Sequence, residues 1–178
     1  MAIVYYSDCT GHGIPGAVLS ALCKSLLHQA CTNPNVLSPG QVLDYTRDRL
    51  MAFFTNNSGS SIVKDGMDAS VCWFNPTKKT LHFAGANQNC LIVRNGRIVE
   101  LAGDRQPVGY FENSEPFTDH VFDAQSDDVV YLFSDGYHDQ FGGERGKKFM
   151  RSRLKELILS IQGESMDNQL ETLRYEFR

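Results

Sequence analysis

The 178 residues, of which 42% are apolar and 11% aromatic, are enough for one compact domain with a substantial core. The 17 basic and 21 acidic residues give a formal net charge of -4, which lacks the basic excess of nucleic-acid-binding proteins, so we expect no nucleic-acid partner. Because no apolar run approaches the roughly 20 residues that span a bilayer, and the five cysteines show no Cys-x-x-Cys spacing, we predict a single domain (residues 1–178) in the reducing cytoplasm.

The first part of the chain predicts a strand followed by two helices. An apolar run at residues 2–6 is typical of a buried strand, and it ends at the polar turn 7–13. Pro15 suits the first turn of a helix, and the apolar residues after it recur at helical spacing: Leu19, Leu22, Cys23, Leu26, Leu27 and Ala30. After Pro39 a second helix is predicted, which ends in the polar stretch 55–61. The side chains of this helix that we expect to point inward are Val42, Leu43, Leu50, Phe53 and Phe54.

The remaining residues predict a sheet-building segment and then two more helices. Short strand-like runs alternate with turn signals, at residues 70–74, 80–84, 90–94, 97–101, 117–122 and 129–133. The Asn95-Gly96 pair is typical of a tight hairpin turn. Beyond Gly146 two helical patterns follow, carried first by Met150, Leu154, Leu157, Ile158 and Ile161 and then by Met166, Leu170, Leu173 and Phe177. Antiparallel strands flanked by helices predict an α+β layered architecture.

Two aspartates each follow a predicted strand directly and stand in a turn that contains glycine. Asp8 belongs to the turn 7–13, and Asp135 follows Ser134 at the end of the run 129–133. Carboxylates held at strand ends, beside glycines that let the backbone approach closely, suit a hard divalent cation such as Mg²⁺ or Mn²⁺. An aspartate in such a turn can instead cap its own backbone. The spacing alone leaves both interpretations open.

Several segments, taken in order, resemble one known family. They are Asp8–Ala17 (DCTGHGIPGA), Asp65–Ser70 (DGMDAS), Phe83–Asn87 (FAGAN), Pro107–Gly109 (PVG) and Phe133–Gly143 (FSDGYHDQFGG). Together they extend over about residues 5–149, and they resemble the PPM-type metal-dependent protein serine/threonine phosphatases, in the bacterial branch typified by the stage II sporulation protein E phosphatase. The resemblance implies a β-sandwich with helices on its outer faces.

The same resemblance implies a site for two Mn²⁺ or Mg²⁺ ions that hydrolyses phosphoserine or phosphothreonine in proteins. Asp8 would contact both ions, the backbone carbonyl of Cys9 would contact one of them, and Asp135 would bind the second. Asp139 would help to hold a third, weaker ion. In such a site two cations lower the pKa of a shared water and stabilise charge on the phosphoryl oxygens.

Other polar residues near these motifs include two histidines and two more aspartates. His12 either protonates the leaving alkoxide as a general acid or has an orienting or structural role, and its spacing from Asp8 favours the latter. His138 is interpreted as a turn residue rather than a ligand. Asp65 and Asp68 either support the site or cap the entry to a strand, and the sequence favours Asp68 slightly for the supporting role.

The chain also departs from the family pattern. That pattern has a further metal-binding aspartate on a strand before residue 1 and an Asp-Asp element beyond residue 178, and neither is present in this sequence. We therefore expect a domain truncated at both ends, with weakened metal binding, weak or no activity, and open strand edges that favour a homodimer.

For the longer gene product, relatives suggest an upstream sensory region, which would make this part cytoplasmic even in a membrane-anchored sensor. By analogy alone, the substrate expected is a phosphorylated protein such as an anti-sigma-factor antagonist. The alternative, from another functional class, is a catalytically silent phosphatase-like module that binds a phosphoprotein or relays a signal.

Overall fold

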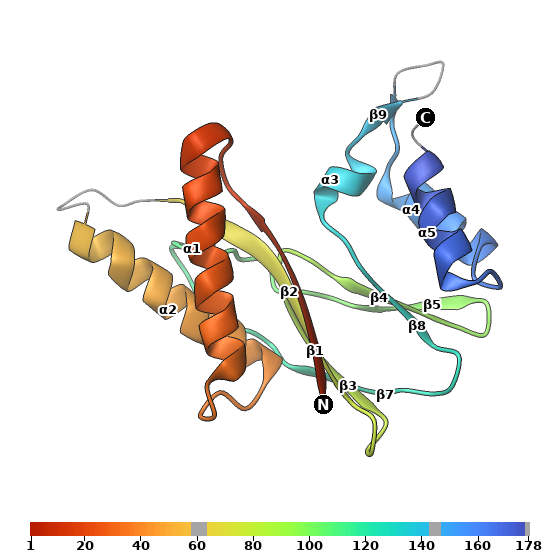
Figure 1. Cartoon of the computed structure of the whole chain (residues 1–178), viewed down its shortest axis with the longest axis horizontal. Coiled ribbons are helices and arrows are strands. Elements are labelled where there is room, and N and C mark those ends of the chain that lie inside the picture. Colours follow the sequence, from red (N-terminus) through yellow and green to blue (C-terminus); the bar gives the residue numbers. More distant parts are fainter. Residues whose placement is uncertain (58–63, 143–146, 177–178) are drawn as a thin grey trace.

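The computed structural model describes residues 1–57, 64–142 and 147–176. Two main antiparallel sheets, to which a separate two-stranded sheet is added, are combined with helices on the outer sides of the main sheets (Figure 1). The elements in chain order are β1 (Ala2–Cys9), α1 (Gly13–Thr32), α2 (Pro39–Asn57), β2 (Gly66–Asn75), β3 (Thr80–Ala86), β4 (Cys90–Arg94), β5 (Arg97–Leu101), β6 (Val108–Gly109), β7 (His120–Asp123), β8 (Val129–Leu132), α3 (Asp135–His138), β9 (Phe141–Gly142), β10 (Lys147–Lys148), α4 (Arg151–Ser160) and α5 (Met166–Tyr175). Within the described ranges, no helix combines the length and the apolar character needed to cross a membrane.

The larger sheet has the strand order β1-β2-β3-β7, and β6 pairs with one end of β2. Strand β1 extends further than the sequence predicted, because Ser7 pairs with Ala69 and Asp8 pairs with Asp68 in the antiparallel ladder to β2. A segment predicted as the start of a turn is therefore part of a strand. The turn itself is confined to the few residues between Cys9 and Gly13.

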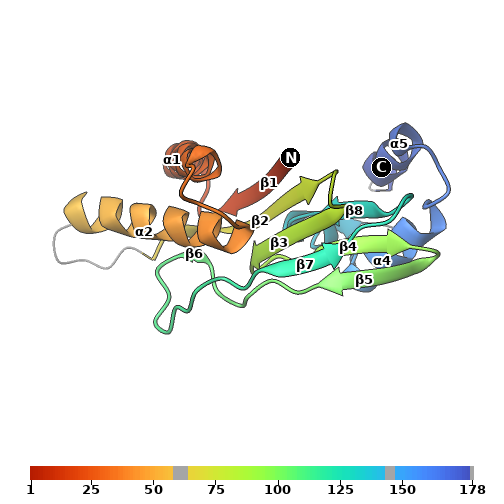
Figure 2. The same cartoon turned by 90° about the horizontal axis from the view of Figure 1, so that it is seen from below.

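Helices α1 and α2 cover one face of the larger sheet (Figure 2). The predicted stripe of α1 is confirmed, since Leu19, Cys23, Leu26, Leu27 and Ala30 are buried. Their packing partners include buried α2 and β2 residues, among them Val42, Leu43, Leu50, Met67 and Val71.

One of the α2 side chains that were predicted to point inward does not do so. The Phe53 side chain is 47% exposed, and its ring lies edge-on to the ring of Phe54, with 5.9 Å between the centroids. Helix α2 also continues to Asn57, through part of the stretch predicted to end it, and residues 58–61 of that stretch lie outside the described residues.

The smaller sheet has the order β5-β4-β8 and faces the other side of the larger sheet. The predicted hairpin is confirmed, because Asn95 and Gly96 connect β4 to β5 with positive φ angles of 49° and 74°. Side chains from both sheets form the core between them, namely Cys72, Leu81, Phe83, Cys90 and Ile92. This packing of two sheets between helical layers confirms the α+β prediction.

The C-terminal helices α4 and α5 lie against the smaller sheet (Figure 1). Both predicted helices are present; Leu154 and Ile158 are buried, whereas Met166 and Leu170 of α5 are exposed. Phe177, which the helical pattern includes, lies outside the described residues. The short elements α3, β6, β9 and β10 were not predicted, because two to four residues are too few to show a period.

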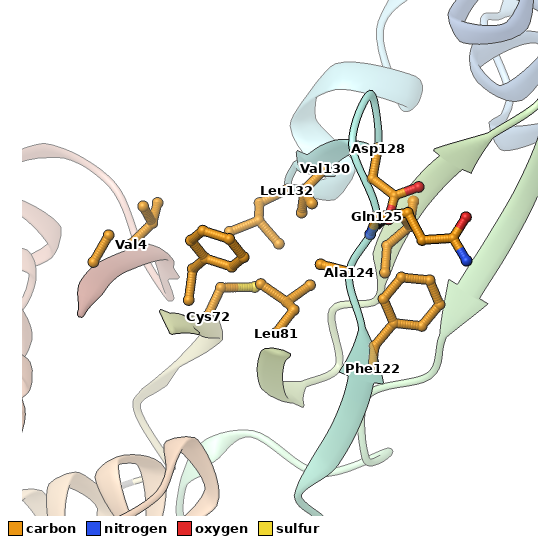
Figure 3. A pocket seen from close by; sticks show the side chains of 12 residues that line it. Val4, Cys72, Leu81, Phe122, Ala124, Gln125, Asp128, Val130 and Leu132 are labelled. Atoms are coloured by element: carbon orange, nitrogen blue, oxygen red, sulfur yellow. Dashed lines mark hydrogen bonds between the residues drawn. The ribbon is translucent and has the colours of Figure 1, made fainter. Parts of the chain in front are cut away.

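An apolar cavity of about 500 Å³ lies between the two sheets (Figure 3). Val4 and Phe74 line it from the larger sheet, and Val130 and Leu132 line it from β8. Strands β1 and β8 beside this cavity are end strands, each paired on one side only within the part of the chain that the structure describes.

Candidate functional site

The first predicted aspartate, Asp8, lies near the end of the antiparallel ladder between β1 and β2. Its direct cross-strand partner is Asp68, so two carboxyl groups stand opposite each other at the end of the ladder. Like charges directly opposite on antiparallel strands repel each other. An arrangement that gathers negative charge in this way suits a site for a cation.

The second predicted aspartate, Asp135, reaches the same region from the other sheet. Strand β8 ends at Leu132, and Asp135 begins the short helix α3 after two further residues. The hydroxyl of Tyr6 on β1 donates a hydrogen bond to Oγ of Ser134, 3.1 Å away. This contact fixes the residue before Asp135 against the strand that carries Asp8.

The charge on Asp68 is affected by both other aspartates. Burial raises the pKa of its carboxyl group, a hydrogen bond from Asn87 lowers it, and the charges of Asp135 and Asp8 raise it, with the net result above the usual range. The structure therefore places Asp8 opposite Asp68, and Asp135 near enough for its charge to act on Asp68. Asp68 was only slightly favoured from the sequence, and its position opposite Asp8 strengthens its case for a supporting role.

Asn87 is a further residue at this site to which sequence reasoning gave no role. Its Nδ2 donates to Oδ1 of Asp68 at 2.8 Å, and its own N–H donates to the carbonyl of Asp104 at 2.8 Å. Asn87 has a φ of 55°, a conformation that asparagine tolerates better than most residues. The signal was available in the motif Phe83–Asn87, which contributed to the resemblance without a function for its last residue.

The turn after Asp8 is held by contacts to β2 and to α1. The N–H of Thr10 donates to the carbonyl of Gly66 at 3.0 Å, and the N–H of Gly66 donates to Oγ1 of Thr10 at 3.1 Å. Gly11 packs directly against Gly16 in the first turns of α1, where an added Cβ at position 16 would lie 2.9 Å from the carbonyl carbon and oxygen of Gly11. Asp65 accepts a hydrogen bond from the Thr10 hydroxyl at 3.3 Å, which assigns it to supporting this turn.

Cys9, whose backbone carbonyl was predicted to bind a metal, also has a distinctive thiol. A hydrogen bond from Cys23 lowers the pKa of the Cys9 thiol to about 7, despite its partial burial and the nearby charge of Asp8. The same interaction, together with burial, raises the pKa of the Cys23 thiol. The end of β1 is thus in side-chain contact with the middle of α1.

The two histidines near the motifs are placed differently. His12 is the residue before α1, and its exposed side chain makes no hydrogen bond that caps the helix. His138 is the last residue of α3, and its ring lies edge-on to Phe133 with 6.0 Å between the centroids. It therefore belongs to a helix rather than to a turn, which corrects the interpretation from sequence.

Asp139, the predicted ligand of a third ion, is in an ion pair. Nζ of Lys148 lies 2.8 Å from its Oδ2, and this hydrogen bond lowers the pKa of the Asp139 carboxyl group. Nε2 of His138 is 4.0 Å from the other carboxylate oxygen. A cation from the chain itself therefore already neutralises this carboxylate.

The donor set suits a divalent cation in its chemistry. Asp8, Asp68 and Asp135 offer carboxylate oxygens, the ligands that hard cations prefer. Burial chiefly raises the pKa of Asp68, and the negative charges of Asp135 and Asp8 add to this effect. Among the described residues, however, no three His, Cys, Asp or Glu side chains are close enough together to hold an ion as they stand. The three aspartates are therefore candidate ligands, and within the described residues they do not form a closed cation site by themselves.

Comparisons with known proteins identify the family. The family model for stage II sporulation protein E (SpoIIE) matches residues 2–178. A search of curated protein sequences gives no match. Among solved structures, the fold is similar to the SiaA-PP2C domain of Pseudomonas aeruginosa, with a TM-score of 0.83, 24% identity, and coverage of 97% of this chain and 70% of that chain.

Two other solved structures share the fold. The PP2C phosphatase domain of SpoIIE from Bacillus subtilis, solved with a fragment of its regulatory domain, gives a TM-score of 0.71 at 14% identity, over 98% of this chain and 47% of that one. The catalytic domain of the serine/threonine protein phosphatase PstP, in complex with two manganese ions, gives 0.63 at 13% identity, over 96% and 80%. Because the family model matches nearly the whole chain, the protein belongs to the SpoIIE family, and it has the fold of the PP2C phosphatase domains.

Proposed function

We propose that this protein hydrolyses phosphoserine or phosphothreonine in a protein substrate, with divalent cations held between its two sheets. The observation that carries the proposal is that Asp8 and Asp68 stand directly opposite each other on β1 and β2, with Asp135 near enough for its charge to raise the pKa of Asp68. Membership of the SpoIIE family and a fold shared with serine/threonine protein phosphatases support it. The B. subtilis chain is about twice as long as the part matched here, so the activity of a whole protein is part of the proposal.

In this proposal Asp8 and Asp135 bind the cations through their carboxylates, and the Cys9 carbonyl adds a neutral ligand. Asn87 holds one oxygen of Asp68 at 2.8 Å, which leaves the other oxygen available to a cation or to a water molecule bound to it. Manganese or magnesium is the expected ion, and the PstP structure with two manganese ions is a parallel. When bound, such ions would supply Lewis-acid activation of water and would neutralise charge on the phosphoryl group.

The chain's own residues would fix the geometry of this reaction. Tyr6 links β1 to the segment before Asp135, and Thr10 anchors the turn after Asp8 to β2. The Tyr6 contact joins the larger sheet to the segment after β8 of the smaller sheet, and the Thr10 contact holds the turn against its own sheet. We place His12 outside the reacting groups, in an orienting or structural role, because its side chain is exposed and does not cap α1.

The proposal is tested by manganese-dependent release of phosphate from a phosphoserine protein. The wild-type chain is compared with Asp135→Asn, with an EDTA-treated sample, and with the matched control Asp167→Asn, which changes an exposed aspartate in the first turn of α5. Release that requires manganese, is lost in Asp135→Asn and persists in Asp167→Asn would support the proposal. Manganese-dependent release that is equal in all the variants would contradict it.

A second candidate, a silent module that binds a phosphoprotein or relays a signal, is favoured by two observations. No three ligating side chains in the described residues form a closed coordination group, and Lys148 neutralises Asp139. Calorimetric titration with manganese separates the two candidates. The module is favoured if the wild-type protein neither binds manganese nor releases phosphate, and yet binds a phosphoserine protein.

A further inference from the structure

Asn87 holds the carboxylate of Asp68, and its own backbone is in an unusual conformation. Nδ2 of Asn87 donates to Oδ1 of Asp68 at 2.8 Å, and Asp68 stands opposite Asp8. The φ angle of Asn87 is 55°, in the left-handed region that residues other than glycine adopt only when surrounding contacts hold them there. The contacts that fix the Asn87 backbone therefore also fix the direction of its amide group.

Those contacts come from Asp104, in the loop between β5 and β6. The N–H of Asn87 donates to the carbonyl of Asp104 at 2.8 Å, and the N–H of Asp104 donates to the carbonyl of Gly85 at 2.8 Å. The two segments lie directly against each other, because an added Cβ on Gly103 would be 2.2 Å from the carbonyl oxygen of Gln88. Asp104 thus uses both of its backbone polar groups to hold the end of β3 and the residue that follows it.

The side chain of Asp104 anchors this loop to a third part of the chain. Its Oδ2 accepts a hydrogen bond from the N–H of Thr118 at 2.7 Å, and its Oδ1 accepts one from the Thr118 hydroxyl at 2.9 Å. Thr118 follows the buried residue Phe117, whose N–H donates to the carboxylate of Asp44 on α2 at 3.3 Å. Both carboxylate oxygens of Asp104 are therefore bound to a segment that is fixed to the core.

We propose that Asp104 is a positioning residue for Asp68 and that it acts through Asn87. The Asp104 carboxylate fixes its own loop against Thr118, the Asp104 carbonyl fixes Asn87, and Asn87 orients one oxygen of Asp68. Residues that orient a metal ligand through hydrogen bonds change the affinity for the metal without touching it. The inference rests on the proposed function in so far as Asp68 serves a bound cation.

The chain offers a matched control in Asp119. Its Oδ2 accepts from the hydroxyl of Ser38 at 2.6 Å, and its Oδ1 accepts from the N–H of Gly40 at 2.7 Å. Asp119 therefore accepts two short hydrogen bonds, as Asp104 does, but its partners lie at the start of α2 rather than beside the site. A substitution that acts only by weakening the fold should have similar effects at the two aspartates.

The first measurement uses protein without metal. The side-chain amide signals of Asn87 are followed in EDTA by two-dimensional proton–nitrogen NMR. We expect Asp104→Ala to shift these signals and Asp119→Ala to leave them in place. Asp104→Asn should also leave them near their wild-type positions, because its amide oxygen can still accept from the Thr118 N–H. Asn87 amide signals that do not move in Asp104→Ala would overturn the proposal.

The second measurement is calorimetric titration with manganese. Asp104→Ala should weaken manganese binding by about tenfold, Asp104→Asn should restore most of the affinity, and Asp119→Ala should bind as the wild type does. Thr118→Val removes only the hydroxyl contact, so it should weaken binding less than Asp104→Ala does. Because Thr118 is exposed, this variant keeps the test available even if Asp104→Ala does not fold.

A double variant shows whether the effect passes through Asn87. Asn87→Gly removes the amide and tolerates the positive φ, so adding Asp104→Ala to it should cause no further loss of manganese affinity. A further loss, or an equal loss in Asp119→Ala, would overturn the inference and leave the proposed function intact. A wild type that binds no manganese would instead contradict the proposed function, and the NMR signals would still decide whether Asp104 orients Asn87.

Discussion

The hydroxyl of Tyr6 lies 3.1 Å from Oγ of Ser134 and joins the larger sheet to the residue before Asp135. The two residues are 128 positions apart in the sequence, so this contact exists only in the folded protein. Because Asp8 follows Tyr6 by two residues and Asp135 follows Ser134 directly, the hydrogen bond sets the separation of two predicted metal ligands. The first prediction concerns this bond.

Tyr6→Phe should reduce phosphatase activity more than it reduces stability. Loss of one exposed hydrogen bond costs about 0.5–1.5 kcal/mol, whereas misplacement of Asp135 weakens cation binding and positioning, with an expected loss of on the order of tenfold in activity. Phosphate release and urea unfolding are measured together. The control is Tyr5→Phe, on the opposite face of β1 against the helices. Equal activity in the two variants would show that the Tyr6 contact does not position the site.

Asp68→Asn should stabilise the protein without metal and weaken its response to metal. The pKa of Asp68 is raised in the folded state, so its ionised form destabilises the fold at any pH above that pKa. This destabilisation disappears as the pH falls from the pKa of Asp68 in the folded protein to its lower pKa in the unfolded protein. The stability advantage of the variant, measured by urea unfolding in EDTA, should therefore be largest near neutral pH and should shrink on acidification through this window.

Manganese should reverse the order of stability of the wild type and Asp68→Asn. A cation neutralises the repulsion among Asp8, Asp68 and Asp135, so it should raise the melting temperature of the wild type more than that of Asp68→Asn. If manganese stabilises both proteins equally, Asp68 does not face the cation. Asp44, whose pKa is also raised chiefly by burial, is present in both proteins and cancels from the comparison.

Gly16→Ala should destabilise the fold through the turn that follows Asp8. The added methyl group would lie 2.9 Å from the backbone carbon and oxygen of Gly11, so the turn or the helix must move. Overpacking of this kind costs about 1–3 kcal/mol. Gly163→Ala is the control, because an added Cβ there meets no atom within 4 Å. Urea unfolding that finds the two variants equally stable would mean that the turn adjusts without cost.

The elements of this fold that were predicted correctly depend on local pattern. The helical stripe from Leu19 to Ala30 and the Asn95-Gly96 hairpin are visible in a short stretch of sequence, and both are present in the structure. Strand β1 was predicted too short, because Ser7 and Asp8 are polar and pair with β2 only through tertiary contacts. Phe53 was placed inward because periodicity cannot show where the neighbouring sheet ends.

The candidate site was predictable in part for the same reason. Asp8 and Asp135 stand out because each follows an apolar run into a glycine-containing turn. The role of Asp68 depends on the register between β1 and β2, and that of Asn87 depends on a positive φ angle and a hydrogen bond to Asp68. Neither register nor such a contact can be derived from spacing along one chain. The Lys148 partner of Asp139 was equally invisible in the sequence.

That ion pair leads to the last prediction, which compares two aspartates one helical turn apart. The charge of Asp135 raises the pKa of Asp68, whereas the Asp139 carboxylate is already paired with Nζ of Lys148 at 2.8 Å. Asp139→Asn removes a supporting group and should therefore lower manganese-dependent phosphate release only a few-fold. Asp135→Asn removes a ligand and should lower it by on the order of a hundredfold.

Lys148→Met frees the Asp139 carboxylate without removing it. If Asp139 can bind a weak third ion, calorimetric titration of Lys148→Met should show tighter or additional manganese binding than the wild type, and this gain should vanish in the double variant with Asp139→Asn. Identical titrations for the wild type and Lys148→Met would restrict Asp139 to its ion pair.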